Sequence, residues 1–200
     1  MGFAGHGGSA LLFLSDLLES GKKTSGASQL DYDKLRILCY PDPRLRRACE
    51  PVVEFGEPLA ALAARMFELM RAARGVGLAA PQVGARVRMF VMNATTAPKD
   101  DLVCVNPEII APDGARESEE GCLSLPEVRV QIRRARRCGL RAQDALGRPF
   151  ELSGQDLVAR VWQHELDHLN GVLIIDRMGP ADRIANKRAL KELEDNYRVP

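Results

Sequence analysis

The sequence predicts an α+β fold, with several short, mostly antiparallel strands around a central helix that carries an HExxH metal-binding motif. An N-terminal amphipathic helix and a C-terminal helix complete the predicted set. Alternating and β-branched runs fill the middle of the chain, and helical periodicity lies on either side without strand–helix–strand alternation. A length of 200 residues suits one well-buried core. We expect a flexible or variable extension over residues 1–30 and a single domain over residues 31–200.

The first predicted elements of this domain are a strand and a long helix. LRILCYPDPRLRR, residues 35–47, predicts a short strand followed by a proline-containing turn. In residues 57–75 apolar side chains recur at steps of three and four, which predicts an amphipathic helix closed by Gly75 as a C-terminal cap. The apolar positions are Leu59, Leu62, Met66, Leu69, Met70 and Ala73.

The middle of the chain has the period of strands. Alternating or β-branched runs occupy residues 85–93, 101–110, 127–135, 137–145 and 147–154. LVARVWQHELDHLNG, residues 157–171, then predicts a second helix with Gly171 just past its end. Residues 172–178 predict a brief strand, and a terminal helix is expected from Pro180 to Tyr197.

Composition and charge narrow the class of protein. Hydrophobic residues make up 46% and charged residues 28% of the chain, as in ordinary soluble domains. A formal net charge of +1 predicts no strong field toward nucleic acid or acidic membranes, so no direct nucleic-acid specificity is expected. The basic run over residues 133–137 is expected at exposed strand positions. The five cysteines form no CxxC pair, which favours a reducing compartment, and buried thiols are expected for Cys39, Cys49, Cys104 and Cys138.

No segment has the signature of a membrane span or a targeting peptide. The best apolar run, from Ala10 to Leu18, is interrupted by Asp16 and is shorter than the roughly 18 to 20 residues that a span requires. No Lys or Arg precedes it, as a signal peptide would require, and the first arginine of the chain is Arg36. We therefore expect a cytoplasmic protein with no membrane partner.

The stretch VWQHELDHLNG carries two of the three histidines of the chain. On a helix, His164 and His168 lie on one face with Cβ atoms about 5 to 6 Å apart, so both can reach one metal ion. Glu165 can then contact a water on that metal without binding the metal itself. Asp167 and Asn170 are expected to face solvent or to orient a ligand histidine.

A catalytic site of this kind needs a third protein ligand. A third histidine shortly downstream is absent, because the remaining one is His6. Glu192 or Glu194 would serve if the protein were a metallopeptidase of the gluzincin type. The alternative is Cys122 in EEGCLSLPEVR, a thiolate beside a glycine that permits close approach to a metal.

Three segments in order resemble the signature motifs of the peptide deformylase family: GVGLAAPQVG, EGCLS and QHELDHLNG. The resemblance extends from about Leu35 to the terminal helix and makes residues 31–200 a single catalytic deformylase domain. It implies hydrolysis of the N-formyl group from the initiator N-formylmethionine of nascent polypeptides, with release of formate. The implied metal ligands are Cys122, His164 and His168.

The resemblance also implies the roles of the remaining site residues. Glu165 would be the general acid/base in the attack of a metal-bound hydroxide. Gln82 and the backbone NH of Leu123 would stabilise the oxyanion. Substrate-binding positions would be Val76, Gly77, Gly121 and Arg129. Gly77 is expected to allow close approach of a peptide that pairs with this edge as an added strand.

The resemblance implies one divalent metal ion, Fe2+ in the cell, with Zn2+ or Ni2+ able to occupy the site in preparations. The donor set alone would suit zinc equally well. Arg160, one turn before His164, stands where some family members carry an apolar residue, so it is expected either to line the methionine pocket or to be solvated. The terminal helix is a candidate ribosome contact, against a solvated face with Lys/Glu pairs. A non-enzymatic member that binds metal or peptides is the second alternative function.

Overall fold

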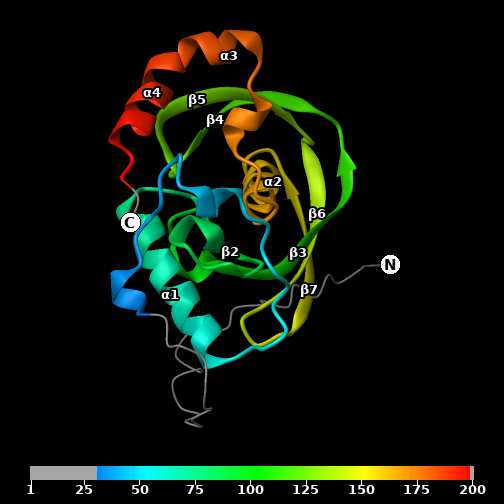
Figure 1. The fold of residues 1–200 in the computed structure, drawn as a ribbon. Helices are drawn as coiled ribbons and strands as arrows, with labels where there is room; N and C mark the ends of the chain where they lie inside the picture. The colour runs from blue at the N-terminus through cyan, green and yellow to red at the C-terminus, as the bar shows by residue number, and fades with distance from the viewer. Residues whose placement is uncertain (1–30, 199–200) are drawn as a thin grey trace.

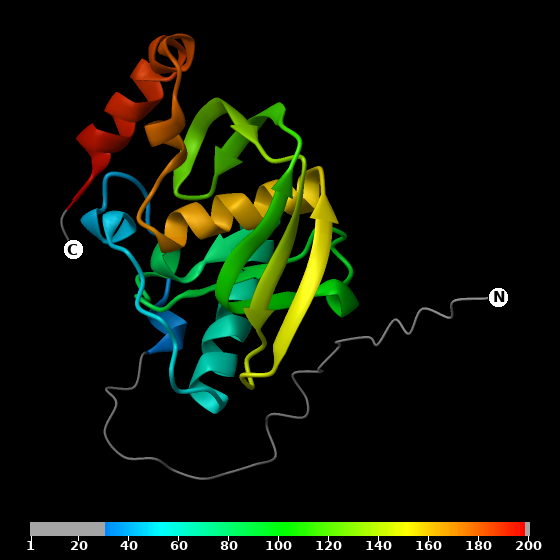
Figure 2. The same cartoon turned by 90° about the vertical axis from the view of Figure 1, so that its right-hand side faces the viewer.

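A computed structural model describes residues 31–198 (Figures 1 and 2). It contains two antiparallel sheets, which confirms the predicted α+β class. The larger sheet has the order β1 (Gly77–Ala79), β2 (Met89–Met92), β3 (Leu102–Asp113), β6 (Arg137–Gln143) and β7 (Pro149–Gln155). The smaller sheet pairs β4 (Arg116–Cys122) with β5 (Leu125–Arg134). Residues 1–30, with the apolar run from Ala10 to Leu18 and His6, lie outside the described part of the chain.

Four α-helices accompany the sheets within residues 31–198. They are α1 (Glu57–Ala72), α2 (Leu157–Leu169), α3 (Pro180–Ala185) and α4 (Lys187–Asn196). Figure 2 shows α2 crossing the molecule with β4 and β5 on one side of it and the large sheet and α1 on the other. The helices α3 and α4 lie at the periphery, next to β5 (Figure 1). No helix in this part of the chain is both long and apolar enough to cross a membrane.

The amphipathic helix α1 packs its apolar face on β1 and β2. Leu62, Met66 and Met70 on this face are almost completely buried, as their three- and four-residue spacing requires. The predicted cap at Gly75 is wrong in one detail: the left-handed residue is Arg74, with φ 56°. The NH of Gly75 instead donates to the carbonyl of Met70 at 2.8 Å, which closes the last turn.

Two predicted strands are wrong. Residues 35–39 form no ladder, although the NH of Leu38 donates to the carbonyl of Gln82 at 2.7 Å. Nearby prolines limit continuous pairing, because proline has no NH to donate. Residues 172–178 form the 3-10 helix η6 (Ile174–Arg177), whose first turn is stabilised by a bond from the NH of Leu173 to the Asp176 carboxylate at 2.8 Å.

The predicted terminal helix is interrupted at Asn186, between α3 and α4. The Asn186 side chain is buried and turned to the neighbouring strand β5. Its amide donates to the carbonyl of Arg129 at 2.7 Å and its oxygen accepts from the NH of Arg129 at 3.1 Å. These bonds compete with the regular helical pattern at this position. They fix α3 and α4 to the strand that follows the Cys122 turn.

Burial corrects two expectations about surface and core. Cys49, Cys104 and Cys138 are buried as predicted, but Cys39 is exposed. Arg134, expected on the surface, is buried at 7% exposure. It continues the inward-facing alternation of β5, in which every second residue from Val128 onward is buried.

Candidate metal centre

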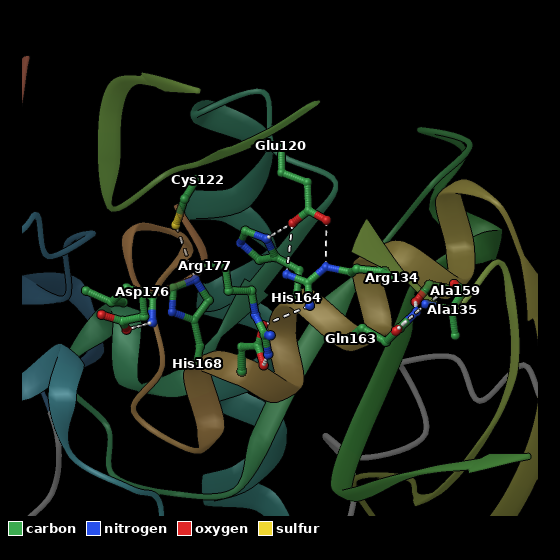
Figure 3. Close-up of polar contacts among 12 residues, drawn as sticks. Glu120, Cys122, Arg134, Ala135, Ala159, Gln163, His164, His168, Asp176 and Arg177 are labelled. Atoms are coloured by element: carbon green, nitrogen blue, oxygen red, sulfur yellow. Dashed lines mark hydrogen bonds and ion pairs between the residues drawn. The ribbon is translucent and has the colours of Figure 1, made fainter. Parts of the chain in front are cut away.

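The helix α2 brings His164 and His168 together on one face, with their ring centroids 5.0 Å apart. Cys122 approaches them from the end of β4, where a register shift and a tight turn precede β5. Its Sγ lies 3.2 Å from Nε2 of His168. One ligand atom from each of these three residues falls within 4.8 Å of the other two, so the trio can surround one ion (Figure 3).

The chemistry of these donors fits a divalent metal. Burial lowers the pKa of His168 well below its ordinary value, so this imidazole is neutral, as a ligand must be. Burial also opposes charge on His164, yet contacts with Cys122 and Glu120 raise the pKa of His164 to about 10. The site thus attracts positive charge. A thiolate with two imidazoles is a donor set suited to zinc or iron.

The alternative ligands on the terminal helix are not near this site. Glu194 accepts a hydrogen bond from the Tyr40 hydroxyl at 2.8 Å, and Glu192 pairs with Arg188 at 2.7 Å. Among the described residues, the group with metal-ligand geometry is the Cys–His–His trio. The alternative third ligand of the gluzincin type, Glu192 or Glu194, is therefore wrong.

Glu120 is a site residue that the sequence did not single out. Its carboxylate lies 2.9 Å from Nδ1 of His164 and accepts two bonds from Arg134, at 2.6 and 2.9 Å (Figure 3). An Nδ1–H donated to Glu120 leaves Nε2 of His164 free for a metal and fixes the orientation of the ring. The expected histidine-orienting role for Asp167 is wrong, because Asp167 instead accepts from Arg134 at 2.8 Å and from Arg177 at 2.7 Å.

Glu165 points into the same region without a partner of its own. Its side chain is 4% exposed, and Oε2 has no hydrogen bond within the described residues. Burial raises the pKa of this carboxyl to about 7. Gly77 makes room for it, because a Cβ at this position would lie 2.3 Å from Oε1 of Glu165.

Gln82 is held from two sides beside the cysteine. Its Oε1 accepts from the NH of Ala79 at 2.8 Å, and its Nε2 donates to Oγ of buried Ser124 at 3.1 Å. The same Nε2 lies 3.6 Å from Sγ of Cys122. One N–H is therefore taken by Ser124 and the other faces the metal site. Leu123, between Cys122 and Ser124, brings its backbone to the same turn.

A cavity of about 550 Å³ opens over these groups. Val76 and Gly77, from the edge of the large sheet, form one side. Gly121 lies opposite, under the Arg129 guanidinium, where a Cβ would come within 2.7 Å of Nη1. Every predicted site residue except His168 lines this cavity. His168 lies just behind the lining, with Nε2 3.2 Å from Sγ of Cys122. Arg160 lines the cavity as well, which favours the pocket alternative for this residue.

Two imidazoles, a cysteine sulfur and an unpaired buried carboxyl group on one cavity are the make-up of a mononuclear metal hydrolase. Comparison with known proteins identifies the family. The family model "Polypeptide deformylase" matches residues 34–184, and the chain belongs to the peptide deformylase family. It is accordingly an enzyme, a hydrolase of N-terminal protein processing that acts on formyl-methionyl peptides. The non-enzymatic alternative is therefore not retained.

Relatives cover most of the chain. It is 44% identical to the peptide deformylase of Acidobacterium capsulatum over 160 residues, which are 79% of this chain and 94% of the relative. It is 45% identical to that of Thermotoga maritima over 159 residues, with 79% and 95% covered. The crystal structure of a peptide deformylase from Legionella pneumophila has a TM-score of 0.76 at 43% identity, covering 82% of this chain and 99% of that one.

Proposed function

We propose that this enzyme removes the N-formyl group from the initiator N-formylmethionine of nascent polypeptides and releases formate. Family membership supports the reaction class. The observation that carries the mechanism is the meeting of three ligand atoms within 4.8 Å beside an unpaired buried carboxylate. Cys122, His164 and His168 would hold the metal.

The metal would be Fe2+ in the cell, with Zn2+ or Ni2+ able to replace it in preparations. When bound, a divalent ion supplies a water of lowered pKa, from about 15.7 toward about 7. If iron is native, activity decays in air and is protected by a reductant. Full activity that tracks zinc content alone would contradict this assignment.

Glu165 would move the proton. Because its pKa is raised to about 7, the carboxylate and the carboxylic acid are both populated near neutral pH. The carboxylate can accept a proton from the attacking water. The acid form can return that proton to the departing amine of methionine.

Gln82 and Leu123 would stabilise the negative charge on the former formyl oxygen. The Gln82 N–H that points to Sγ of Cys122 and the backbone NH of Leu123 both lie on the side of the cavity that carries Cys122. One such donor typically contributes about 3 to 4 kcal/mol to transition-state stabilisation. The Gln82 amide cannot rotate freely to exchange its oxygen and nitrogen, because its oxygen already accepts a hydrogen bond from the NH of Ala79.

Substrate peptide would add to the large sheet at β1. This strand is the last in the order of its sheet, so one of its edges is available to an extended chain. Val76 and Gly77 would offer backbone groups on one side, with Gly121 and Arg129 on the other.

Formate release from formyl-Met-Ala-Ser by the metal-loaded protein tests this function. Glu165→Gln should abolish release, while Glu151→Gln, an exposed change on β7, should not affect it. No formate from a metal-loaded preparation would refute the reaction. For the ligand set, Cys122→Ala should lose the metal and Cys39→Ala should retain it, as measured by metal stoichiometry.

We also propose that the enzyme acts in the cytoplasm, on chains emerging from the ribosome. The helices α3 and α4 support a ribosome contact, because they lie at the periphery and neither helix contains a buried residue. Co-sedimentation with ribosomes should weaken when Arg183 and Lys187 are changed to Gln. Unchanged co-sedimentation would contradict this contact.

A further inference from the structure

A second hollow adjoins the catalytic cavity at the N-terminal end of α2. It has a volume of about 220 Å³, enough for an acidic side chain. Leu157 and Arg160 line both the hollow and the catalytic cavity, so the two spaces are neighbours along the helix. Arg160 precedes His164 by one turn, a rise of about 6 Å along the helix axis.

The hollow is rich in arginine. Arg116 and Arg136 share a single carboxylate, that of Asp156, at 2.8 and 3.3 Å. Arg134 also contributes to the lining, but its charge is taken up by the buried carboxylates behind the metal site.

Arg160 is the guanidinium of this hollow that has no anionic partner. No carboxylate within residues 31–198 lies at ion-pair distance from it, whereas the other three arginines are all paired. Arg116, Arg136 and Arg160 carry three positive charges against the one negative charge of Asp156, which leaves an excess of two. An anion placed here would relieve repulsion among half-exposed cations and gain a charge-assisted bond.

We infer that Arg160 and this hollow form a subsite for an acidic side chain of the formyl peptide, downstream of the methionine. The inference rests on the proposed deformylase function and specifies its substrate class: nascent chains with Asp or Glu among the first residues after formylmethionine. Peptide is the expected ligand because Arg160 lines both the hollow and the cavity that would receive the scissile group. A phosphate of RNA is the competing ligand, and the experiment distinguishes it.

Binding can be measured without turnover in the Glu165→Gln background. Calorimetry compares peptides that carry Glu or Gln at the second, third or fourth position of formyl-Met-Ser-Ala-Ser. At low salt we expect the Glu form of at least one pair to bind about threefold to fivefold more tightly, the size typical of a partly exposed ion pair. The ratio of the Glu and Gln peptide affinities should fall toward one in 0.5 M salt, because this ionic strength screens exposed charges.

Charge variants identify the residue responsible. Arg160→Gln should abolish the preference for Glu, and Arg160→Glu should reverse it in favour of a Lys peptide. Arg148→Gln is the matched control: it removes an exposed arginine that pairs with Asp144 on the β6–β7 turn and lines neither space. It should leave the ratio unchanged.

The outcomes separate this inference from the proposed function. Equal affinities for every Glu/Gln pair, or a preference that survives Arg160→Gln, would overturn the subsite even if formate is released. Binding of a short RNA that depends on Arg160, with no such dependence for peptides, would overturn it in favour of the competing ligand. Absence of formate release from formyl-Met-Ala-Ser by the unaltered enzyme would instead refute the deformylase function, whatever the peptide affinities.

Discussion

Glu120, Arg134 and Asp167 form a buried wall behind the metal site. This wall and the terminal helix α4 both carry ion pairs, but in opposite environments. Arg134 and Glu120 are 6% and 4% exposed in their side chains, while Arg188 and Glu192 on α4 are 90% and 58% exposed. The shortest N–O distance is nearly the same in both places, 2.6 and 2.7 Å, and Arg134 makes a second bond to Glu120 at 2.9 Å. Burial makes the larger difference: a buried charge that loses its partner has no water to replace it, whereas an exposed one is solvated at once.

Glu120→Ala should break the buried wall with the largest effect. It leaves the Arg134 guanidinium without its main partner and Nδ1 of His164 without an acceptor. Breaking a buried pair of this kind costs about 3–5 kcal/mol, and loss of such an outer partner weakens metal binding about 10- to 100-fold. Urea denaturation and competition with a chelator measure the two effects.

Glu119→Ala is the matched control for this prediction. Glu119 is the neighbouring residue on β4, and its side chain is exposed. It should alter neither stability nor metal affinity appreciably. Equal behaviour of the two variants would mean that the buried pair has no special weight.

The buried wall also marks the boundary of what the sequence could predict. The HExxH spacing, the α1 periodicity and the strand-rich middle follow from local patterns, and the fold class with them. Arg134 could have been placed inside, because it continues the alternation of Val128, Val130 and Ile132. The contact between Glu120 and His164 joins residues 44 positions apart, so no local pattern reveals it.

The order and pairing of the strands could not be predicted from local sequence patterns either. That β4 and β5 leave the large sheet, and that β3 pairs with β6 across them, depends on long-range packing around α2. The break at Asn186 depends on a partner 57 residues away, Arg129. Cys39 was misjudged because the apolar run around it suggested a strand with a buried face, and no strand forms there.

Ser124→Ala removes a neutral hydrogen bond of the site, and its effect can be compared with the loss of the buried ion pair. The Ser124 hydroxyl holds one N–H of Gln82, and a neutral hydrogen bond contributes about 1 kcal/mol net. If this bond positions the amide for the oxyanion, kcat should fall about fivefold with KM and metal content unchanged. Ser153→Ala, exposed on β7, is the control. A change in melting temperature or KM alone would indicate a merely structural hydroxyl.

Asp42→Asn probes an ion pair of intermediate burial. The hydrogen bonds from Arg44, at 2.6 and 2.9 Å, lower the pKa of Asp42, although Arg44 itself is 38% exposed. After allowance for solvent screening, the loss should be about 0.5–1 kcal/mol at pH 7. Because the folded pKa is depressed, this stability is present above the unfolded pKa of about 3.9 and is lost as pH falls through the folded value.

Urea denaturation at pH 7 and near pH 3 measures that dependence. The difference between the unaltered enzyme and Asp42→Asn should shrink at the lower pH. Asp33→Asn, an exposed change in the 3-10 helix Tyr32–Lys34, should give no difference at either pH. A gap that grows on acidification would contradict the sign of the pKa shift.

Arg188→Gln should have the smallest effect and thereby complete the comparison. The pair with Glu192 spans one turn of α4, and both side chains are in solvent, so water and salt replace each charge as soon as its partner is removed. Glutamine also keeps the helix propensity of the position. The melting temperature should match that of the unaltered enzyme at low and high salt, by circular dichroism. A loss approaching that of Glu120→Ala would show that burial does not set the strength of these pairs.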